Sequence, residues 1–294
     1  MNATEEKIKV TIKDLKEWLE QQNRKEEAYF RRISEIEKMS DEETIRKSII
    51  NQFDYLDIWY ENNFVYDMLV KGTSSFRYDL VSNGYYVMYL SNILSEMYPN
   101  NPPSPMFDEA SWWLSNCIIQ KCYKEAETLL NIINKGLTTK YLNGGRDFKM
   151  AAWFIIEIFN KCFDNSIDYT KFNYPEDMKV YQMVLNNWNT NDLNLVDSIV
   201  SSLCDYHLSQ ASYGDMSESA GRNDPMFLQF SMTSWFVYAF EILTWLRVRE
   251  KVGLKNPEKF SHPLMNMPLN QLPVENMHIS GNELFDKIVK KLNS

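Results

Sequence analysis

The sequence contains few of the residues that interrupt helices. Of its 294 residues, 9 are Gly and 10 are Pro, whereas an all-β protein needs many turns built from these two residue types. No segment alternates convincingly between polar and apolar residues as a half-buried strand does, and no G-x-G-x-x-G motif follows a strand-like run. The composition therefore predicts an all-α protein made of long helices joined by few loops.

Basic, histidine and cysteine residues are also scarce. The 31 Lys and Arg residues face 40 Asp and Glu residues, which gives a net charge of −9, whereas a nucleic-acid-binding protein needs a basic surface to neutralise phosphates. The 3 His and 4 Cys residues form no H-E-x-x-H, E-x-x-H or C-x-x-C motif. We therefore expect no nucleic-acid ligand, no metal, no cofactor, and cysteines that remain free thiols.

The sequence also lacks a clear membrane or export signal. The first ten residues, MNATEEKIKV, do not contain the apolar segment of a signal peptide, so we expect a cytoplasmic protein. The stretch 225–246 approaches the length of a membrane span, with Glu241 as its only charged residue. Gln229, Ser231 and Thr233 make it too polar for a span, and we interpret it as a helix in the protein core.

Apolar residues at helical spacing divide the chain into a series of expected helices. These helices cover about 4–39, 40–70, 75–97, 108–135 (unbroken, or broken once near Cys122), 147–163, 175–188, 192–207, 225–253 and a short stretch after Ser280. The expected caps are Ser40 with Glu43, Asp108, Pro175 in a first turn, Asp192, Asp224 with Pro225, and Ser280 with Glu283. The expected turn between the two halves is the NGG sequence at 143–145.

The expected architecture is a multi-helix bundle of antiparallel helix pairs. We expect an N-terminal helical region, 1–136, and a C-terminal helical region, 146–294, packed together as one compact unit. A proline-containing strip, SHPLMNMPLNQLPVEN at 261–276, follows the most apolar expected helix. Its three prolines exclude a helix, while its Leu and Met side chains need burial. We therefore expect an extended segment packed on the helical core.

Glu241 stands inside the apolar sequence SWFVYAFEILTWL. A lone carboxylate is costly to bury without a partner. Its candidate partners are Arg247, Tyr206, His207 and Arg77. We interpret Glu241 as a structural, buried hydrogen-bonding residue. The alternative is a catalytic base in a cleft, but the sequence places no second acid or nucleophile beside it.

Acidic and aromatic residues gather in the expected helix at 40–70. Asp54, Asp57 and Glu61 follow the spacing i, i+3, i+7, so they share one helix face. Trp59 and Tyr60 lie close to them, and aromatic residues beside charges are typical of binding interfaces. The pattern predicts that these five residues form a partner-binding surface. The alternative interpretation is an ordinary solvated helix face.

Two segments of the C-terminal region carry a resemblance to a known family. The sequence YQMVLNNWNTNDLNLVDSIVSSLCDYH at 181–207 is followed, after a loop, by VYAFEILTWL at 237–246. Tyr238, Phe240 and Glu241 match a pattern of an aromatic residue, any residue, an aromatic residue and Glu. In this arrangement the chain resembles the PoNi-type immunity proteins of polymorphic nuclease toxins.

The N-terminal region adds the pair Arg77-Tyr78, which is similar to an Arg-Tyr motif of that family, with Gly84 displaced. The sequence departs from the family at 242–244, where a run of small residues is expected, and at His262-Pro263, where Tyr-Pro is expected. The resemblance implies a bacterial antitoxin that binds and neutralises a secreted toxin directly, without catalysis. Such toxins are often nucleases with basic surfaces, which an acidic partner could cover. The alternatives are a helical scaffold or regulatory adaptor that binds a peptide or small ligand, and an enzyme that uses Glu241.

Overall fold

The computed structural model describes most of the chain. The described residues are 3–22, 26–36, 38, 42–103, 105–139, 141–142, 148–163, 167–213, 228–279 and 281–292. Over these ranges the chain forms 11 α-helices and no strand, which confirms the predicted all-α class. The helices are α1 Ala3–Gln21, α2 Glu26–Ile36, α3 Glu42–Lys71, α4 Arg77–Met97, α5 Phe107–Ile119, α6 Tyr123–Gly136, α7 Met150–Asn160, α8 Val180–Asn187, α9 Leu193–Gln210, α10 Phe240–Lys251 and α11 Glu283–Leu292.

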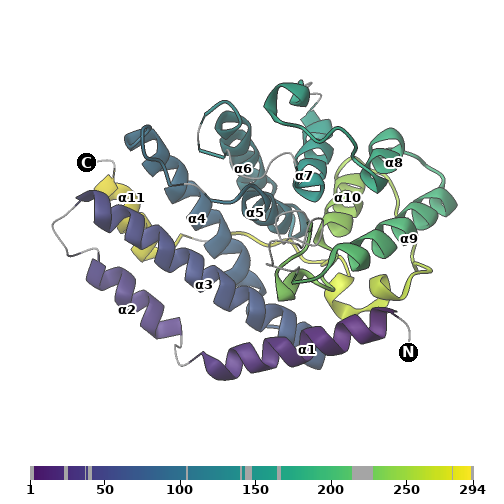
Figure 1. Cartoon of the computed structure of the whole chain (residues 1–294), viewed down its shortest axis with the longest axis horizontal. Coiled ribbons are helices and arrows are strands. Elements are labelled where there is room, and N and C mark those ends of the chain that lie inside the picture. The colour runs from purple at the N-terminus through teal and green to yellow at the C-terminus, as the bar shows by residue number, and fades with distance from the viewer. Residues whose placement is uncertain are drawn as a thin grey trace, which may run out of the picture.

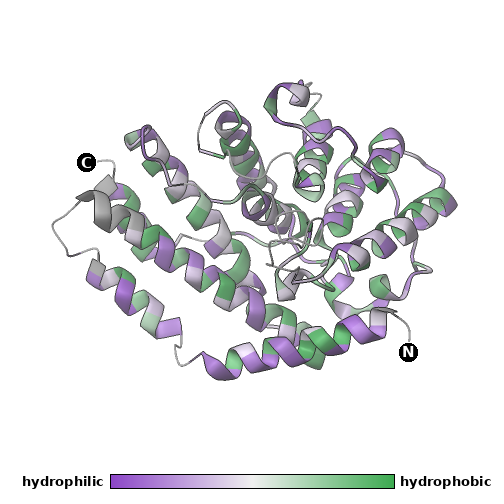
Figure 2. Ribbon diagram, in the orientation of Figure 1, coloured by the Kyte–Doolittle hydropathy of each residue, from purple (hydrophilic) through white to green (hydrophobic). Residues whose placement is uncertain are grey.

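The helices lie side by side across the molecule, from α2 and α3 on one side to α8 and α9 on the other (Figure 1). Helix α1 runs along one edge and contacts both α3 and α9. Its turns alternate between hydrophilic and hydrophobic residues (Figure 2), as expected of a helix with one face on the protein. Helix α1 therefore joins the two sides of the molecule.

Helix α5 lies at the centre of the core. From Ala110 to Ile119 every one of its residues is buried, because α4, α6, α7 and α10 surround it. A helix that is covered all round must be central. Because α7 and α10 belong to the C-terminal half, the two halves of the chain share one core. Within the described ranges, no helix is both long enough and apolar enough to cross a membrane, and the four cysteines are free thiols.

The N-terminal half follows the predicted helices with three changes. The expected helix over 4–39 is divided into α1 and α2. The expected helix over 108–135 breaks once, as one of the two alternatives stated, because Lys121 adopts a left-handed backbone conformation with φ 61° between α5 and α6. Helix α5 begins one residue before Asp108, so the N-cap residue is Met106.

Helix α8 is shorter than predicted. It begins at Val180, so Pro175 does not lie in its first turn. In the preceding segment, the Tyr174 hydroxyl donates a hydrogen bond of 2.7 Å to Glu157 of α7. The predicted N-cap of α9 is confirmed, since the Asp192 carboxylate accepts hydrogen bonds from the first backbone N–H groups of that helix.

The predicted long helix over 225–253 is wrong in its first half. Of its described part, residues 228–239 are irregular apart from one 3₁₀ turn, and α10 begins only at Phe240. The side chain of Asn270 forms hydrogen bonds with the backbone of this segment: it accepts from the Ala239 N–H and donates to the Val237 carbonyl. The predicted end is confirmed, because Gly253 adopts φ 82° after the last turn.

Several expected caps lie outside the described residues. They are Ser40, Asp224 with Pro225, and Ser280, and the expected turn at 143–145 also lies outside the described residues. Helix α11 nevertheless has a cap that the sequence interpretation missed: the side-chain oxygen of Asn282 accepts hydrogen bonds from the Leu284 and Phe285 N–H groups at 3.0 and 3.1 Å.

The proline-containing strip packs on the core, as predicted, but it is not fully extended. It forms two short 3₁₀ turns, Pro263–Asn266 and Pro268–Asn270, each beginning at a proline. Leu264 and Leu269 are buried, and the second turn contacts α3. Val274, near the end of the strip, is 88% exposed.

Candidate functional site

The five residues predicted to bind a partner all lie on α3. Asp54, Asp57 and Glu61 share one face, but this face points into the protein. Asp57, Tyr60 and Glu61 are each 3% exposed, while Asp54 and Trp59 are half-buried. The expected exposed acidic face is therefore wrong, because α1, α2 and α4 pack around α3 and leave little of it in contact with solvent.

The carboxylate of Asp57 is held between two other helices. Its Oδ2 accepts a hydrogen bond of 2.8 Å from Trp113 Nε1 of α5, and its Oδ1 accepts one of 3.3 Å from Asn83 Nδ2 of α4. Glu61, one turn further along α3, accepts a hydrogen bond from the Ser234 hydroxyl. Both buried acids thus have donors, as buried polar groups require.

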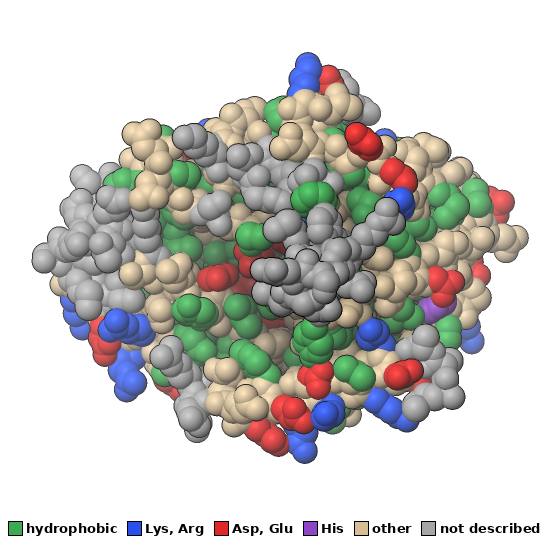
Figure 3. All heavy atoms as spheres, in the orientation of Figure 1, with side chains coloured by type: hydrophobic (Ala, Val, Ile, Leu, Met, Phe, Trp, Pro, Cys, Tyr) green, Lys and Arg blue, Asp and Glu red, His purple; other side chains and the backbone are tan. Residues whose placement is uncertain are grey.

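A cavity of about 290 Å³ opens beside Trp113, where α3, α4, α5 and the loop between α4 and α5 meet. We call this cavity the acidic recess. Asp54 and Glu109 line it, together with Trp113, the apolar side chains of Ile50 and Val87, and prolines of the loop. Figure 3 shows acidic side chains inside a hollow that is bordered by hydrophobic ones.

The acidic residues of this region raise one another's pKa values. Burial raises the pKa of Asp57 to about 8, and the charges of Asp54 and Glu109 add to the shift. Burial, followed by the charge of Asp54, raises the pKa of Glu109 to about 7, although Lys149 opposes the shift. Burial also raises the pKa of Glu61 well above its ordinary value. No Lys or Arg side chain in the described part of the chain forms an ion pair with any of these four carboxylates.

Glu109 and Trp113 were not singled out in the sequence. Glu109 lies three residues after the N-cap residue Met106, where an acid often bonds back to the N-cap backbone, but the expected cap at Asp108 hid this signal. In the structure Glu109 accepts a hydrogen bond of 2.9 Å from the Met106 N–H. This bond fixes Glu109 at the start of α5, but only the packing of α5 on its neighbours brings it to the recess.

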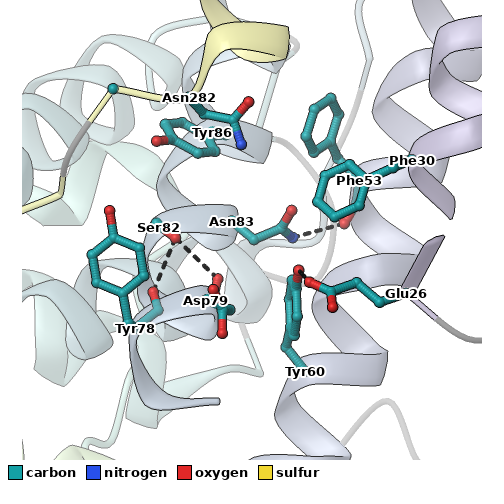
Figure 4. A pocket seen from close by; sticks show the side chains of 11 residues that line it. Glu26, Phe30, Phe53, Tyr60, Tyr78, Asp79, Ser82, Asn83, Tyr86 and Asn282 are labelled. Atoms are coloured by element: carbon teal, nitrogen blue, oxygen red, sulfur yellow. Dashed lines mark hydrogen bonds between the residues drawn. The ribbon is translucent and has the colours of Figure 1, made fainter. Parts of the chain in front are cut away.

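A second, smaller cavity lies beside Asn83, the other donor to Asp57. Its volume is about 160 Å³, and it is formed by α2, α3, α4 and the residues that precede α11 (Figure 4). We call it the aromatic recess because its walls include the rings of Phe30, Phe53, Tyr60, Tyr78 and Tyr86. Asn83 lines this cavity and Trp113 lines the acidic recess, so the two donors to Asp57 belong to different cavities.

Glu241 is fully buried and pairs with His207, one of its candidate partners. The distance between His207 Nδ1 and Glu241 Oε1 is 2.8 Å, and His207 Nε2 lies 2.9 Å from the Trp235 carbonyl. Because a carbonyl only accepts, Nε2 carries a proton, so the bond to Glu241 contains one further proton shared between the two residues. With both side chains 0% exposed, a substrate cannot reach the pair, which favours a structural role over catalysis.

The fold and the two recesses together define an all-α protein with an acid-lined hollow on one face. Within the described ranges, no group of three or more His, Cys, Asp or Glu residues has the arrangement of a metal site. Comparison of the chain with known protein families, with curated proteins and with solved structures found no match. The resemblance to PoNi-type immunity proteins stays a prediction.

Proposed function

We propose that this chain is an immunity protein that neutralises a cognate secreted toxin by binding it directly. The observation that carries the proposal is the pair of carboxylates, Asp54 and Glu109, that lines the acidic recess, with the buried Asp57 adding to the negative charge behind Trp113. Placing acids where burial and like charges raise their pKa values destabilises the folded protein. Such arrangements are characteristic of functional sites rather than of packing.

A basic side chain of the toxin is the group that this recess would bind best. Entering the recess, a Lys or Arg side chain replaces the like-charge repulsion between Asp54 and Glu109 with attraction. It also lowers the pKa of Glu109, which burial raises to about 7, so binding releases protons and becomes tighter as the pH rises from about 6 to 8. Trp113 and Val87 provide apolar contacts for the stem of such a side chain.

Two features of the sequence support the same proposal. The net charge of −9 attracts a basic partner over a distance and speeds association. The motif around Glu241 resembles that of immunity proteins, in which the implied target is a nuclease with a basic surface. Binding over that surface would block the toxin without any reaction.

The test is co-expression with the product of the neighbouring gene, followed by purification of the complex. We expect the chain to protect cells and to form a complex with that product. The double variant Asp54→Asn, Glu109→Gln should weaken binding by about 10- to 100-fold, the usual loss when a desolvated charge pair is broken. The matched control is Glu17→Gln, Glu20→Gln on α1, which removes two exposed charges and should change affinity about twofold or less.

Two results would contradict the proposal. One is the absence of both protection and complex formation. The other is equal binding by the acidic-recess variant and by the α1 control, because the net charge alone would then explain the association.

A further inference from the structure

The aromatic recess has the composition of a binding site for a positively charged group. Glu26 of α2 and Asp79 of α4 both line this small space, and five aromatic rings surround it (Figure 4). The faces of aromatic rings attract cations, and such rings combined with acids are the usual means of binding ammonium groups.

The charge of the recess is not balanced by the described residues. Neither Glu26 nor Asp79 forms an ion pair with a Lys or Arg side chain there, and the Tyr60 hydroxyl is the donor to Glu26. Burial, followed by the charge of Glu26, raises the pKa of Asp79. A cation between the two carboxylates would remove this unfavourable interaction.

Asn83 independently indicates that the ligand is a hydrogen-bond donor. Its side chain is 4% exposed, and its Nδ2 donates to the Phe53 carbonyl at 2.8 Å and to Asp57. These bonds fix the orientation of the amide, so its oxygen points into the recess (Figure 4). No described residue donates to that oxygen, so it is available to accept a hydrogen bond from a ligand.

The size of the recess limits the ligand to a small group. Its volume of about 160 Å³ is below the range of about 300–1,000 Å³ that is usual for drug-sized ligands. We propose that the aromatic recess binds one organic cation, an alkylammonium or guanidinium group, held by Glu26 and Asp79, the Asn83 oxygen and the surrounding rings. This site is separate from the acidic recess and is proposed independently of the proposed toxin binding. Its ligand is either a Lys or Arg side chain of another protein or a free amine.

The test is titration calorimetry of the purified chain with n-butylammonium chloride and with ethylguanidinium chloride at constant ionic strength. We expect dissociation constants of about 1–10 mM, as ligands of this size permit. The uncharged control 1-butanol, which has a similar shape, should bind at least about 10-fold more weakly.

Variants separate this site from the acidic recess. Asp79→Asn should weaken butylammonium binding by about 10-fold or more, whereas Asp54→Asn should change it about twofold or less. Glu26→Gln, which keeps an acceptor for the Tyr60 hydroxyl, is measured in parallel and should also weaken binding. Circular dichroism and thermal melting establish that each variant is folded.

Three results would overturn the proposal: no heat of binding at about 50 mM butylammonium, equal binding of butanol, or unchanged binding in both Asp79→Asn and Glu26→Gln. Comparison with N-acetyl-lysine methylamide identifies the source of the cation. Binding about 10-fold tighter than that of butylammonium assigns the site to a protein side chain, and any smaller ratio assigns it to a free amine.

Discussion

The buried carboxyl of Asp57 should make the stability of this fold depend on pH, and the variant Asp57→Asn tests this expectation. In the folded protein burial raises its pKa to about 8, although Trp113 and Asn83 donate hydrogen bonds to it. In the unfolded chain the carboxyl has its ordinary pKa of 3.8. Between these two values the folded state keeps a proton that the unfolded state releases.

The sign and size of the effect follow from this difference. The stability that the protonated carboxyl contributes is fully present below about pH 4 and is lost as the pH rises through about 8. Within this window one extra bound proton changes the free energy of unfolding by about −1.4 kcal/mol per pH unit. From about pH 5.5 to 7.5, Asp57 alone should therefore lower the free energy of unfolding by roughly 2.7 kcal/mol. Glu61 and Glu109, whose pKa values are also raised, act in the same direction.

Urea unfolding, followed by tryptophan fluorescence at several pH values, measures this dependence. In Asp57→Asn the residue no longer titrates, so the decline in stability with pH should be shallower by up to about 1.4 kcal/mol per pH unit. The amide also places an N–H₂ group against one of two existing donors, which costs about 1–3 kcal/mol at every pH. This constant loss shifts the curve but leaves its slope unchanged.

The slope of the free energy of unfolding against pH therefore decides whether Asp57 titrates differently in the folded and unfolded states. The control Glu20→Gln removes an exposed acid and should leave the slope as it is in the unchanged protein. Parallel stability curves for the unchanged protein and Asp57→Asn would show that Asp57 titrates alike in the folded and unfolded states. This result would contradict the burial of the Asp57 carboxyl between Trp113 and Asn83.

Three further predictions concern buried contacts, and each is measured by urea or thermal unfolding. Gly84→Ala would place a methyl group 2.5 Å from Trp113. This clash outweighs a gain in helix propensity of about 1 kcal/mol, so the free energy of unfolding should fall by about 1–4 kcal/mol. A stabilised variant would contradict this prediction. Glu241→Gln can still bond to His207 and should cost under about 1.5 kcal/mol, whereas Glu241→Ala should cost about 3–5 kcal/mol; equal losses would contradict the pairing. Asn270→Ala removes three buried hydrogen bonds and should cost about 2–4 kcal/mol, so a loss under about 0.5 kcal/mol would contradict its role.

The sequence predicts a helix well where local signals and tertiary packing agree. Helix α9 begins after Asp192, whose side chain caps it, and α10 ends before Gly253, as expected. The sequence predicts a helix poorly where a side chain from a distant part of the chain forms hydrogen bonds with the backbone. The segment before α10 has the apolar composition of a helix, but Asn270, more than 30 residues away, bonds to its backbone groups. A local pattern cannot reveal such a competitor.

The candidate site was predictable only in part, for the same reason. The spacing of Asp54, Asp57 and Glu61 correctly places them on one face of α3. It does not say whether that face meets solvent or another helix, and Glu109, which completes the acidic recess, lies almost 50 residues further along the chain. The aromatic recess was still harder to predict. Its two acids come from α2 and α4, and they form a common site only because those helices pack together in the fold.

The position of Asp57 has one more consequence, which rests on both proposed binding sites. Its two hydrogen-bond donors, Asn83 and Trp113, line the aromatic and the acidic recess respectively. A cation in either recess lowers the pKa of Asp57 and displaces its proton. A second cation in the other recess then meets a carboxylate that is already charged, so each ligand should favour the other, and by the same factor. Because both binding events draw on the same proton, this coupling should vanish above about pH 9, where Asp57 is charged beforehand, and in Asp57→Asn.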